Sequence, residues 1–209
     1  MGRYLGASCR LCRREGMKLF LKGDKCYTPK CAVEKRNFPP GQHGQLRVKL
    51  SGYGIQLREK QKVKRVYGTL ERQFKRYFSI AQRKKGVTGQ LLLELLETRL
   101  DNVLYRMGFA RSRIEGRQMA RHRQITVNGR RVDIPSFGVK IGDVIQIAPG
   151  SDERTARIKQ NVESTKDRPA PAWIAIDHDQ LKGVIQRMPQ KDDIGLAIQE
   201  QLIVELYSK

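Results

Sequence analysis

Four cysteines near the start of the chain have the spacing of a metal site. Cys9 and Cys12 form a C-x2-C pair, and Cys26 and Cys31 form a C-x4-C pair. Four thiolates fill the tetrahedral shell of Zn²⁺ and leave no open position, so the pattern favours a structural site over a catalytic one. Basic neighbours are expected to lower the thiol pKa values and to offset the negative charge of the thiolates. These neighbours are Arg10, Arg13, Arg14, Lys25 and Lys30.

Three other interpretations of the cysteines compete with zinc. Two disulfides are typical of secreted domains, but the N-terminus lacks the apolar centre of a signal peptide, so a reducing cytosol is expected. A thioredoxin-type redox pair needs a βαβ setting, for which Cys9 lies too near the N-terminus. An iron–sulfur cluster uses the same ligands and is kept as a minor alternative. We therefore predict one structural zinc ion per chain.

A second group of residues suited to chemistry lies on a short predicted helix. Ser112 and Glu115 have the spacing of a capping box, in which each side chain accepts from a backbone N–H of the other end. Arg113, Arg117 and Arg121 follow at four-residue steps. This spacing places three guanidinium groups on one face, where they can fork onto phosphate oxygens.

A hairpin follows this helix. The sequence Ile125-Thr126-Val127, Asn128-Gly129, Arg130-Arg131-Val132 predicts two strands joined by a type I′ turn, because Asn and Gly both tolerate positive φ. The turn would present Arg130 and Arg131 to a phosphate. Asn128 and Gly129 fit an RNA contact and a plain structural turn equally well. A further strand is expected at Val144–Ile147.

The charge of the chain indicates a polyanionic partner. The 209 residues carry 42 Lys and Arg against 21 Asp and Glu, a net charge of +21. The excess is +9 in residues 1–50, +8 in 51–100 and +5 in 101–150, and it is −1 in 151–209. Solubility needs a net charge of only about 2–8, so nucleic acid is the first candidate partner. A hydrophobic content of 39% excludes wholesale disorder, and no apolar run approaches the ~18 residues of a membrane span.

The elements that must position these groups are mostly helical in the first half of the chain. Apolar residues recur at three- and four-residue steps from Leu57 to about Lys85, which predicts two helices broken at Gly68-Thr69. Thr88 is expected to cap one apolar helix that ends at Gly108. The basic residues that mostly fall off the first stripe, and are expected to contact phosphate, are Arg58, Lys60, Lys62, Lys64, Arg65, Arg72, Lys75, Arg76, Arg83, Lys84 and Lys85.

The remaining segments are turn-rich or contain short elements. Two prolines and two glycines in residues 38–44 predict an extended connector. A polar surface helix is expected at 152–165, and short strands at 173–176, 183–185 and 202–206. Trp173 is interpreted as a core residue.

The segment from Ser112 to Asp133 resembles the small RNA-binding module named after small-subunit ribosomal protein S-four. The pattern of that module is a capped helix, a turn and a strand ending in Val-Asn-Gly, here Val127-Asn128-Gly129. Other motifs extend the resemblance to the bacterial S-four family over essentially the whole chain. They are Met1–Tyr4, the four cysteines, Pro39-Pro40-Gly41-Gln42-His43-Gly44, Arg58–Lys62, Arg99–Val103 and Gln201–Tyr207.

This resemblance, with the patterns above, implies an α+β fold. A helical N-terminal domain with the zinc knuckle would be followed by an embedded αβ RNA-binding module with its β-hairpin. The predicted segments are a zinc-knuckle arm at 1–45, a helical RNA-binding domain at 46–95, the S-four-type module at 96–150, and a C-terminal helix with short strands at 151–209. The predicted RNA contacts are Arg3, Arg10, Arg13, Arg14, Gln42, His43, Arg58, Lys60, Lys62, Arg65, Arg113, Arg117, Arg121, His122, Arg123, Asn128, Gly129, Arg130 and Arg131.

The resemblance also implies partners. It points to a cytoplasmic protein of the small ribosomal subunit that binds the 5′ domain of 16S rRNA at a multi-helix junction, early in assembly. Such a protein would lie beside ribosomal proteins S-three and S-five, around the channel through which mRNA enters, and would affect decoding accuracy. Some relatives repress their own mRNA, and some lack the cysteines, so zinc would serve the N-terminal fold. Neither a membrane nor a small-molecule substrate is expected.

Two positions depart from the pattern of the module. Gly116 stands where the module usually has Ala, and a glycine inside a helix costs ~1 kcal/mol in propensity. Arg123 stands where it usually has Gly after the histidine that ends the helix. Arg123 must therefore adopt positive φ, or the helix must end differently.

Two other functions compete with this interpretation. The same module is attached to RNA-modifying enzymes, and Arg99-Leu100-Asp101 is similar to the sequence around the pseudouridine synthase aspartate. This motif lies before the module rather than after it, and only 59 residues follow residue 150, so Asp101 is interpreted as a helix-surface carboxylate that pairs locally. The third function is a factor that visits ribosomes, whose association would be labile to salt.

Overall fold

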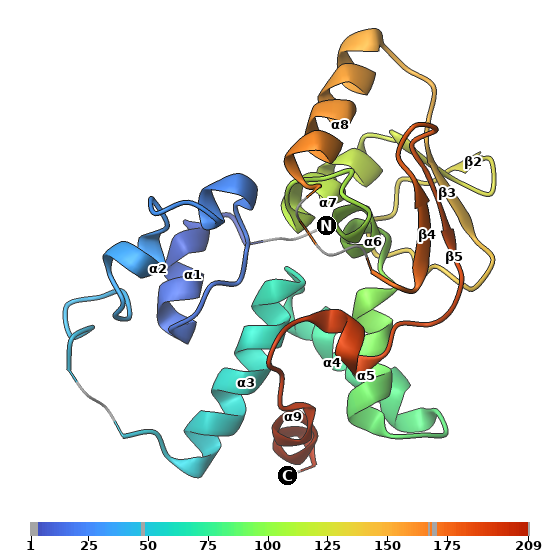
Figure 1. Cartoon of the computed structure of the whole chain (residues 1–209). Coiled ribbons are helices and arrows are strands. Elements are labelled where there is room, and N and C mark those ends of the chain that lie inside the picture. The colour runs from blue at the N-terminus through green and yellow to red at the C-terminus, as the bar shows by residue number, and fades with distance from the viewer. Residues whose placement is uncertain (1–3, 47–48, 167, 169–170, 209) are drawn as a thin grey trace. The chain divides into compact units, whose positions relative to one another are not determined.

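The computed structural model describes residues 4–46, 49–166, 168 and 171–208. It divides the chain into two compact units. One unit contains Met1–Leu92 and Leu196–Lys209, and the other contains Leu93–Gly195. The second unit holds the sheet (Figure 1), and the described part of the first unit is helical. The expected α+β fold is confirmed. The four-segment division stays a prediction.

The first unit begins with short helices and continues with two longer ones. Gly68 adopts φ 60° between the two longer helices, so the predicted break at this position is confirmed. The helices are α1 (Ser8–Glu15), the 3-10 helix η1 (Gly23–Cys26), α2 (Ala32–Lys35), α3 (Gly52–Val66) and α4 (Glu71–Arg83).

The C-terminal segment closes the first unit as a helix, α9 (Glu200–Tyr207). The strand expected at 202–206 is therefore wrong. A short apolar run with β-branched residues does not distinguish a strand from a buried helix, and packing decides the outcome here. The ring of Tyr207 stacks on Phe78 at 4.5 Å, and Gln56 of α3 donates to Glu205 at 2.9 Å.

Glu71 forms hydrogen bonds with residues of both α3 and the end of α9. Lys60 and Lys64 of α3 donate to its carboxylate at 2.8 and 2.9 Å, and the Tyr207 hydroxyl donates at 3.0 Å. Partial burial by itself raises the pKa of Glu71, but these hydrogen bonds outweigh it and lower the pKa to about 2. The carboxylate is therefore charged at neutral pH and holds both lysines.

The apolar helix expected from Thr88 to Gly108 is two helices, α5 (Thr88–Glu97) and α6 (Leu100–Arg106). Arg99 between them has extended backbone angles, φ −68° and ψ 136°, and pairs with Gly138 in an isolated β-bridge. Thr88 is the first helical residue rather than a cap, because the Leu91 N–H bonds to the Val87 carbonyl. An apolar pattern shows no break when both helices are buried on the same side.

A five-stranded antiparallel sheet organises the second unit, in the order β2-β1-β3-β5-β4. The strands expected near 125–132, 144–147, 173–176 and 183–185 and the polar helix near 152–165 are confirmed. Apolar residues of α6, α7 and α8 pack with the sheet into one core, in which Trp173 is fully buried. The elements are α7 (Arg113–Arg121), β1 (Ile125–Val127), β2 (Arg130–Arg131), β3 (Val144–Ile147), α8 (Asp152–Ser164), β4 (Ile174–Asp177), β5 (Lys182–Ile185) and the 3-10 helix η2 (Lys191–Ile194).

Gly116 is explained by the close packing of α7 on α6. A Cβ at this position would stand 2.5 Å from the carbonyl oxygen of Asp101 and 3.4 Å from the Cβ of Leu104. An alanine would force the two helices apart, so the cost of glycine in the helix is offset by a closer interhelical contact.

Arg123 adopts the left-handed conformation that its position requires, with φ 56°. The Gln124 N–H bonds to the Met119 carbonyl and the Arg123 N–H to the Ala120 carbonyl, at 3.1 and 3.0 Å. These two bonds form a Schellman motif at the end of α7. A side chain in this conformation costs roughly 1–2 kcal/mol, which glycine avoids.

The Arg123→Gly substitution is therefore expected to raise the free energy of unfolding of the second unit by about 1 kcal/mol. Trp173 is the only tryptophan and is fully buried in the second unit, so its fluorescence in a urea titration measures this. Arg121→Gly is the matched control. It places the same change inside the last helical turn, where glycine lowers stability by up to about 1 kcal/mol. Equal effects of the two changes would contradict the argument.

Candidate nucleic-acid interface

The three arginines of α7 do not form one phosphate-binding face. The Arg113 guanidinium is buried, donates to Asn102 at 2.7 Å and lies 4.4 Å from the centre of the Tyr105 ring. Arg117 lies 3.5 Å from the carboxylate of Asp101. Arg121 is exposed. Positions four residues apart differ by about 40° around a helix, so the row turns from the core at Arg113 to solvent at Arg121.

Only one of the two predicted capping-box hydrogen bonds is present at the start of α7. The Ser112 hydroxyl accepts from the Glu115 N–H at 3.3 Å. The Glu115 carboxylate accepts from the N–H of Arg111 at 2.8 Å and also from the Asn161 side chain at 3.1 Å. Glu115 therefore bonds one residue before Ser112 and ties α7 to α8, which differs from a reciprocal capping box.

The hairpin after α7 has the predicted turn. Asn128 and Gly129 have φ of 51° and 78°, and β1 pairs antiparallel with β2. The Asn128 side chain donates to Asp143 and accepts from the N–H of Val144, both at 2.8 Å. These bonds fix the hairpin to the start of β3 and support the structural interpretation of Asn128.

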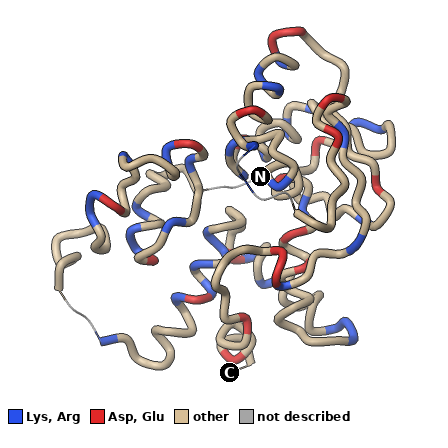
Figure 2. Tube along the Cα trace, viewed as in Figure 1, with Lys and Arg blue, Asp and Glu red and all other residues tan. Residues whose placement is uncertain are grey.

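Exposed cations gather where α7 ends and at the hairpin. Figure 2 shows the Lys and Arg positions, including those of the hairpin tip beside β2. Arg123 makes an exposed ion pair with Asp133 at 3.3 Å. Such a pair contributes about 0–1 kcal/mol and is easily exchanged for a phosphate. The exposed predicted contacts here are Arg121, His122, Arg123, Asn128, Gly129, Arg130 and Arg131.

The predicted contacts on α3 are all paired within the first unit. Arg58 and Arg65 share the carboxylate of Glu15, Lys60 binds Glu71 and Lys62 binds Glu59. Their side chains are 23%, 20%, 11% and 15% exposed, in that order. Each has an internal structural role, and its contact with RNA stays a prediction.

The more accessible basic face lies on α4, among the residues whose spacing predicts phosphate contact. Positions 72, 75, 76 and 83 recur at helical spacing opposite the buried Phe74, Phe78 and Ala81. No ion pair involves this face among the residues that the structure describes. The spacing was a sufficient signal, because the apolar residues mark the opposite side. The exposed residues of this face and of the loop after it are Arg72, Lys75, Arg76, Arg83, Lys84 and Lys85.

The predicted contacts in the N-terminal segment are mostly accessible. Arg10, Arg14, Gln42 and His43 are exposed. Arg13 is half-buried, because its guanidinium donates to the Phe38 carbonyl at 3.0 Å and lies over the Phe38 ring. Arg3 lies outside the described residues.

The four cysteines line one small cavity of about 10 Å³. None of the four is joined in a disulfide. Burial raises the pKa of Cys12 and Cys26, and the neighbouring thiols add to the shift, so the expectation that basic neighbours lower these pKa values is wrong. Within the described ranges, no group of three or more His, Cys, Asp or Glu side chains is arranged to hold a metal ion.

Asp101 has no catalytic setting. It is 3% exposed, and Arg99 donates to its two oxygens at 3.0 and 2.5 Å. The local pairing expected from the sequence is confirmed, whereas the surface location is wrong. Both oxygens are occupied, so the carboxylate is a structural partner of arginine.

None of the described helices is long and apolar enough to cross a membrane.

Comparison with known proteins identifies the family. Residues 3–97 match the family model described as the ribosomal protein S4/S9 N-terminal domain, and residues 98–145 match the S4 domain. The small ribosomal subunit protein uS4 of Geobacter sp. (strain M21) is 58% identical over 209 residues, and that of Citrifermentans bemidjiense is also 58% identical. That of Thermodesulfovibrio yellowstonii is 56% identical. Each alignment covers 100% of both chains. The chain therefore belongs to the family of small ribosomal subunit protein uS4.

Proposed function

We propose that this chain is a structural constituent of the small ribosomal subunit that binds 16S rRNA and is not an enzyme. Similarity over the full length to proteins named for that subunit carries the proposal. The physical support is the net charge of +21 and the exposed cations at the end of α7, on the hairpin and on α4. Phosphate contacts supply affinity and shape supplies specificity, because the deep groove of A-form RNA hides its base edges.

The finer placement also belongs to the proposal. The chain would bind the 5′-domain junction early and nucleate assembly, with S-three, S-five and the mRNA path as neighbours in the cytoplasmic subunit. Two units that each carry exposed cations suit a protein that holds several RNA helices at once. The acidic last quarter of the chain, with an excess of −1, suits contacts with basic proteins.

Zinc is the proposed metal of the N-terminal segment. Cys9, Cys12, Cys26 and Cys31 would hold it, and their placement around one cavity supports this donor set. The thiols would lose protons when the metal binds, because the thiolate is the ligand. Bound zinc would cross-link α1, η1 and the start of α2. An iron–sulfur cluster remains the alternative with the same ligands.

Binding to the isolated 5′ domain of 16S rRNA, titrated across salt with tRNA as competitor, tests the function. Specific binding that survives the competitor is the expected result. The double variant that combines Arg121→Ala with Arg131→Ala should bind more weakly at every salt concentration. The slope of log K against log salt should flatten by about one unit per lost phosphate contact.

Lys159→Ala provides the matched control. Lys159 is an exposed residue of α8 in the segment without positive excess, so its loss should leave the slope unchanged. Equal flattening by both variants would contradict a defined interface. Abolition of binding by tRNA would favour a factor that visits the ribosome.

A further inference from the structure

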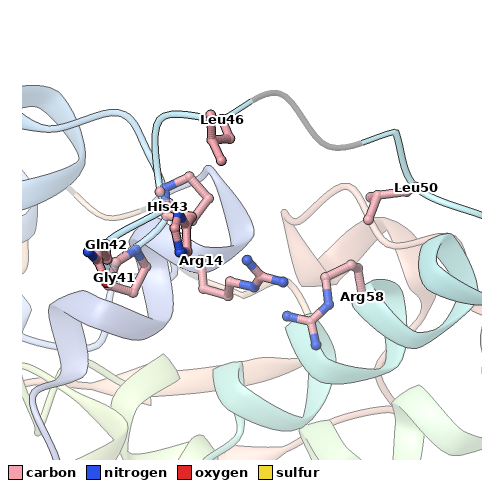
Figure 3. Close-up of a pocket in the computed structure, with 10 residues that line it drawn as sticks. Arg14, Gly41, Gln42, His43, Leu46, Leu50 and Arg58 are labelled. Carbon is pink, nitrogen blue, oxygen red and sulfur yellow. The ribbon is translucent and has the colours of Figure 1, made fainter.

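A cavity of about 540 Å³ lies in the first unit, between the loop that follows α2 and the helices α1 and α3. In Figure 3, Arg14 and Arg58 extend toward each other from the two helices, and His43 lies on the loop beside Arg14. Its lining combines cationic, amide and apolar groups without a carboxylate. The lining residues are Arg14, Pro39, Pro40, Gly41, Gln42, His43, Gly44, Leu46, Leu50 and Arg58.

The loop wall of the cavity is held in shape by specific contacts. Arg13 fixes its start by donating to the Phe38 carbonyl at 3.0 Å and by covering the Phe38 ring at 4.8 Å. Gly44 donates to the Gly41 carbonyl at 3.3 Å. A Cβ at Gly44 would stand 2.0 Å from the backbone oxygen of Pro39, so only glycine allows this curl.

The cationic wall has more positive charge than its own acid neutralises. Glu15, whose side chain is 3% exposed, is shared by Arg58 and Arg65. Its charge can balance only one of these two guanidinium groups. Arg14 adds a third, has no hydrogen bond or ion pair within the described ranges, and repels Arg58. Guanidinium groups that face one another across a cavity are a binding arrangement for a phosphate, which accepts forked hydrogen bonds from both.

The rest of the lining suits a flat, partly apolar group. The proline rings and the His43 imidazole offer faces, and Gln42 offers both a donor and an acceptor. The volume falls in the range of about 300–1,000 Å³ that is typical of small-ligand sites. Unstacked RNA bases are recognised by stacking on aromatic or guanidinium planes together with hydrogen bonds to the base edge.

We propose that this cavity binds one unpaired nucleotide of the RNA, with its phosphate between Arg14 and Arg58 and its base against His43 and the two prolines. The inference rests on the proposed RNA-binding function and gives this part of the N-terminal unit a role in reading a flipped-out base. A free nucleotide has the same chemistry, so the test must separate the two sources.

The test measures the reactivity of unpaired bases in the 5′ domain of 16S rRNA with and without the full chain. One unpaired base should be protected by the unmodified chain and exposed again by Arg14→Gln and by His43→Ala. Arg14→Gln should weaken binding about tenfold, since it removes a charge-assisted bond. Arg14 makes no hydrogen bond or ion pair among the described side chains and acts on Glu15 only at longer range, so its replacement is expected to disturb the fold less than that of Arg58. Arg58→Gln is unsuitable, because it would leave Glu15 with fewer partners.

Lys35→Gln is the matched control, because Lys35 is exposed on α2 and does not line the cavity. It should retain the base protection and weaken binding less than threefold. Equal effects of Arg14→Gln and Lys35→Gln, or protection that survives both cavity variants, would overturn the proposal while leaving RNA binding intact. Failure of the unmodified chain to bind the 5′ domain would instead overturn the proposed function.

Adenosine monophosphate alone separates the free nucleotide from the RNA. The chain has three histidines, so the ring signals of His43 can be followed by NMR beside those of His122 and His178. Adenosine monophosphate is expected to shift only the His43 signals, and the shifts should not reach saturation, because most of the affinity comes from the rest of the RNA. The Arg14→Gln variant should show no such shifts. Saturation by the mononucleotide without any base protection in the RNA would assign the cavity to a free nucleotide and overturn the proposal.

Discussion

Replacement of Cys9 and Cys12 by serine is expected to release one zinc ion per chain and to unfold the N-terminal segment while the second unit stays folded. The described helices of this segment are too short to be stable by themselves. Its helices α1 and α2 contain eight and four residues, far below the ~12–15 residues at which isolated helices become even marginal. A structural zinc site can supply about 10–16 kcal/mol to the fold of a small peptide at pH 7.

Metal content and hydrogen exchange measure the two parts of this effect. Amides of residues 5–46 should lose protection, whereas the Trp173 unfolding transition should be unchanged, because Trp173 lies in the other unit. Ser8→Ala, on α1 beside Cys9, is the control and should keep the metal. Full zinc content in the double variant would contradict the assigned ligands. If the unmodified chain contains iron and absorbs visible light, the bound group is an iron–sulfur cluster and not zinc.

The pH dependence of the metal has a defined direction. Burial raises the pKa of Cys12 and Cys26, so these thiols are protonated in the metal-free chain at neutral pH. Binding must release protons, and zinc affinity therefore falls as the pH falls. The same chemistry explains why the sequence-based expectation of lowered pKa values was wrong. It considered the charges next to the cysteines along the chain, but not their burial.

Local chemistry made some elements predictable from the sequence. The Asn128-Gly129 turn follows from the conformations that two adjacent residues tolerate, and the structure has φ of 51° and 78° there. The Ser112 cap and the break at Gly68 are local in the same sense. The C-terminal helix was not predictable in this way. Its state depends on α3 and α4, which lie more than 100 residues earlier in the chain.

Partners distant in the sequence limited the prediction of the interface. Arg65 and Arg58 look like surface cations by type and spacing, but Glu15 lies 50 and 43 residues away in the chain and pairs with both. The buried Arg113 guanidinium likewise donates to Asn102. Residue type predicts which side chains could bind phosphate. Only the folded chain shows which of them are already used by the protein.

Replacement of Asp101 by asparagine is expected to destabilise the second unit by about 3–5 kcal/mol. The change keeps the shape of the side chain but removes its charge, and it takes from the Arg99 guanidinium, which is 1% exposed, the carboxylate to which it donates twice. The pair of Arg117 with the Asp101 carboxylate is weakened at the same time. Denaturant unfolding followed by Trp173 fluorescence measures the loss, because this tryptophan lies in the core of the same unit.

Asp133→Asn separates burial from charge as the cause. Asp133 also pairs with an arginine, at 3.3 Å, but the Arg123 side chain is 70% exposed, so breaking this pair should cost at most about 1 kcal/mol. If both substitutions lower the free energy of unfolding by a similar amount, the burial of Arg99 is not the cause of the destabilisation. If the difference is found, the similarity of Arg99-Leu100-Asp101 to an enzyme motif has a structural explanation. The carboxylate that such an enzyme needs free for catalysis is used here to neutralise an arginine at the junction of α5 and α6, where the two helices enter the core.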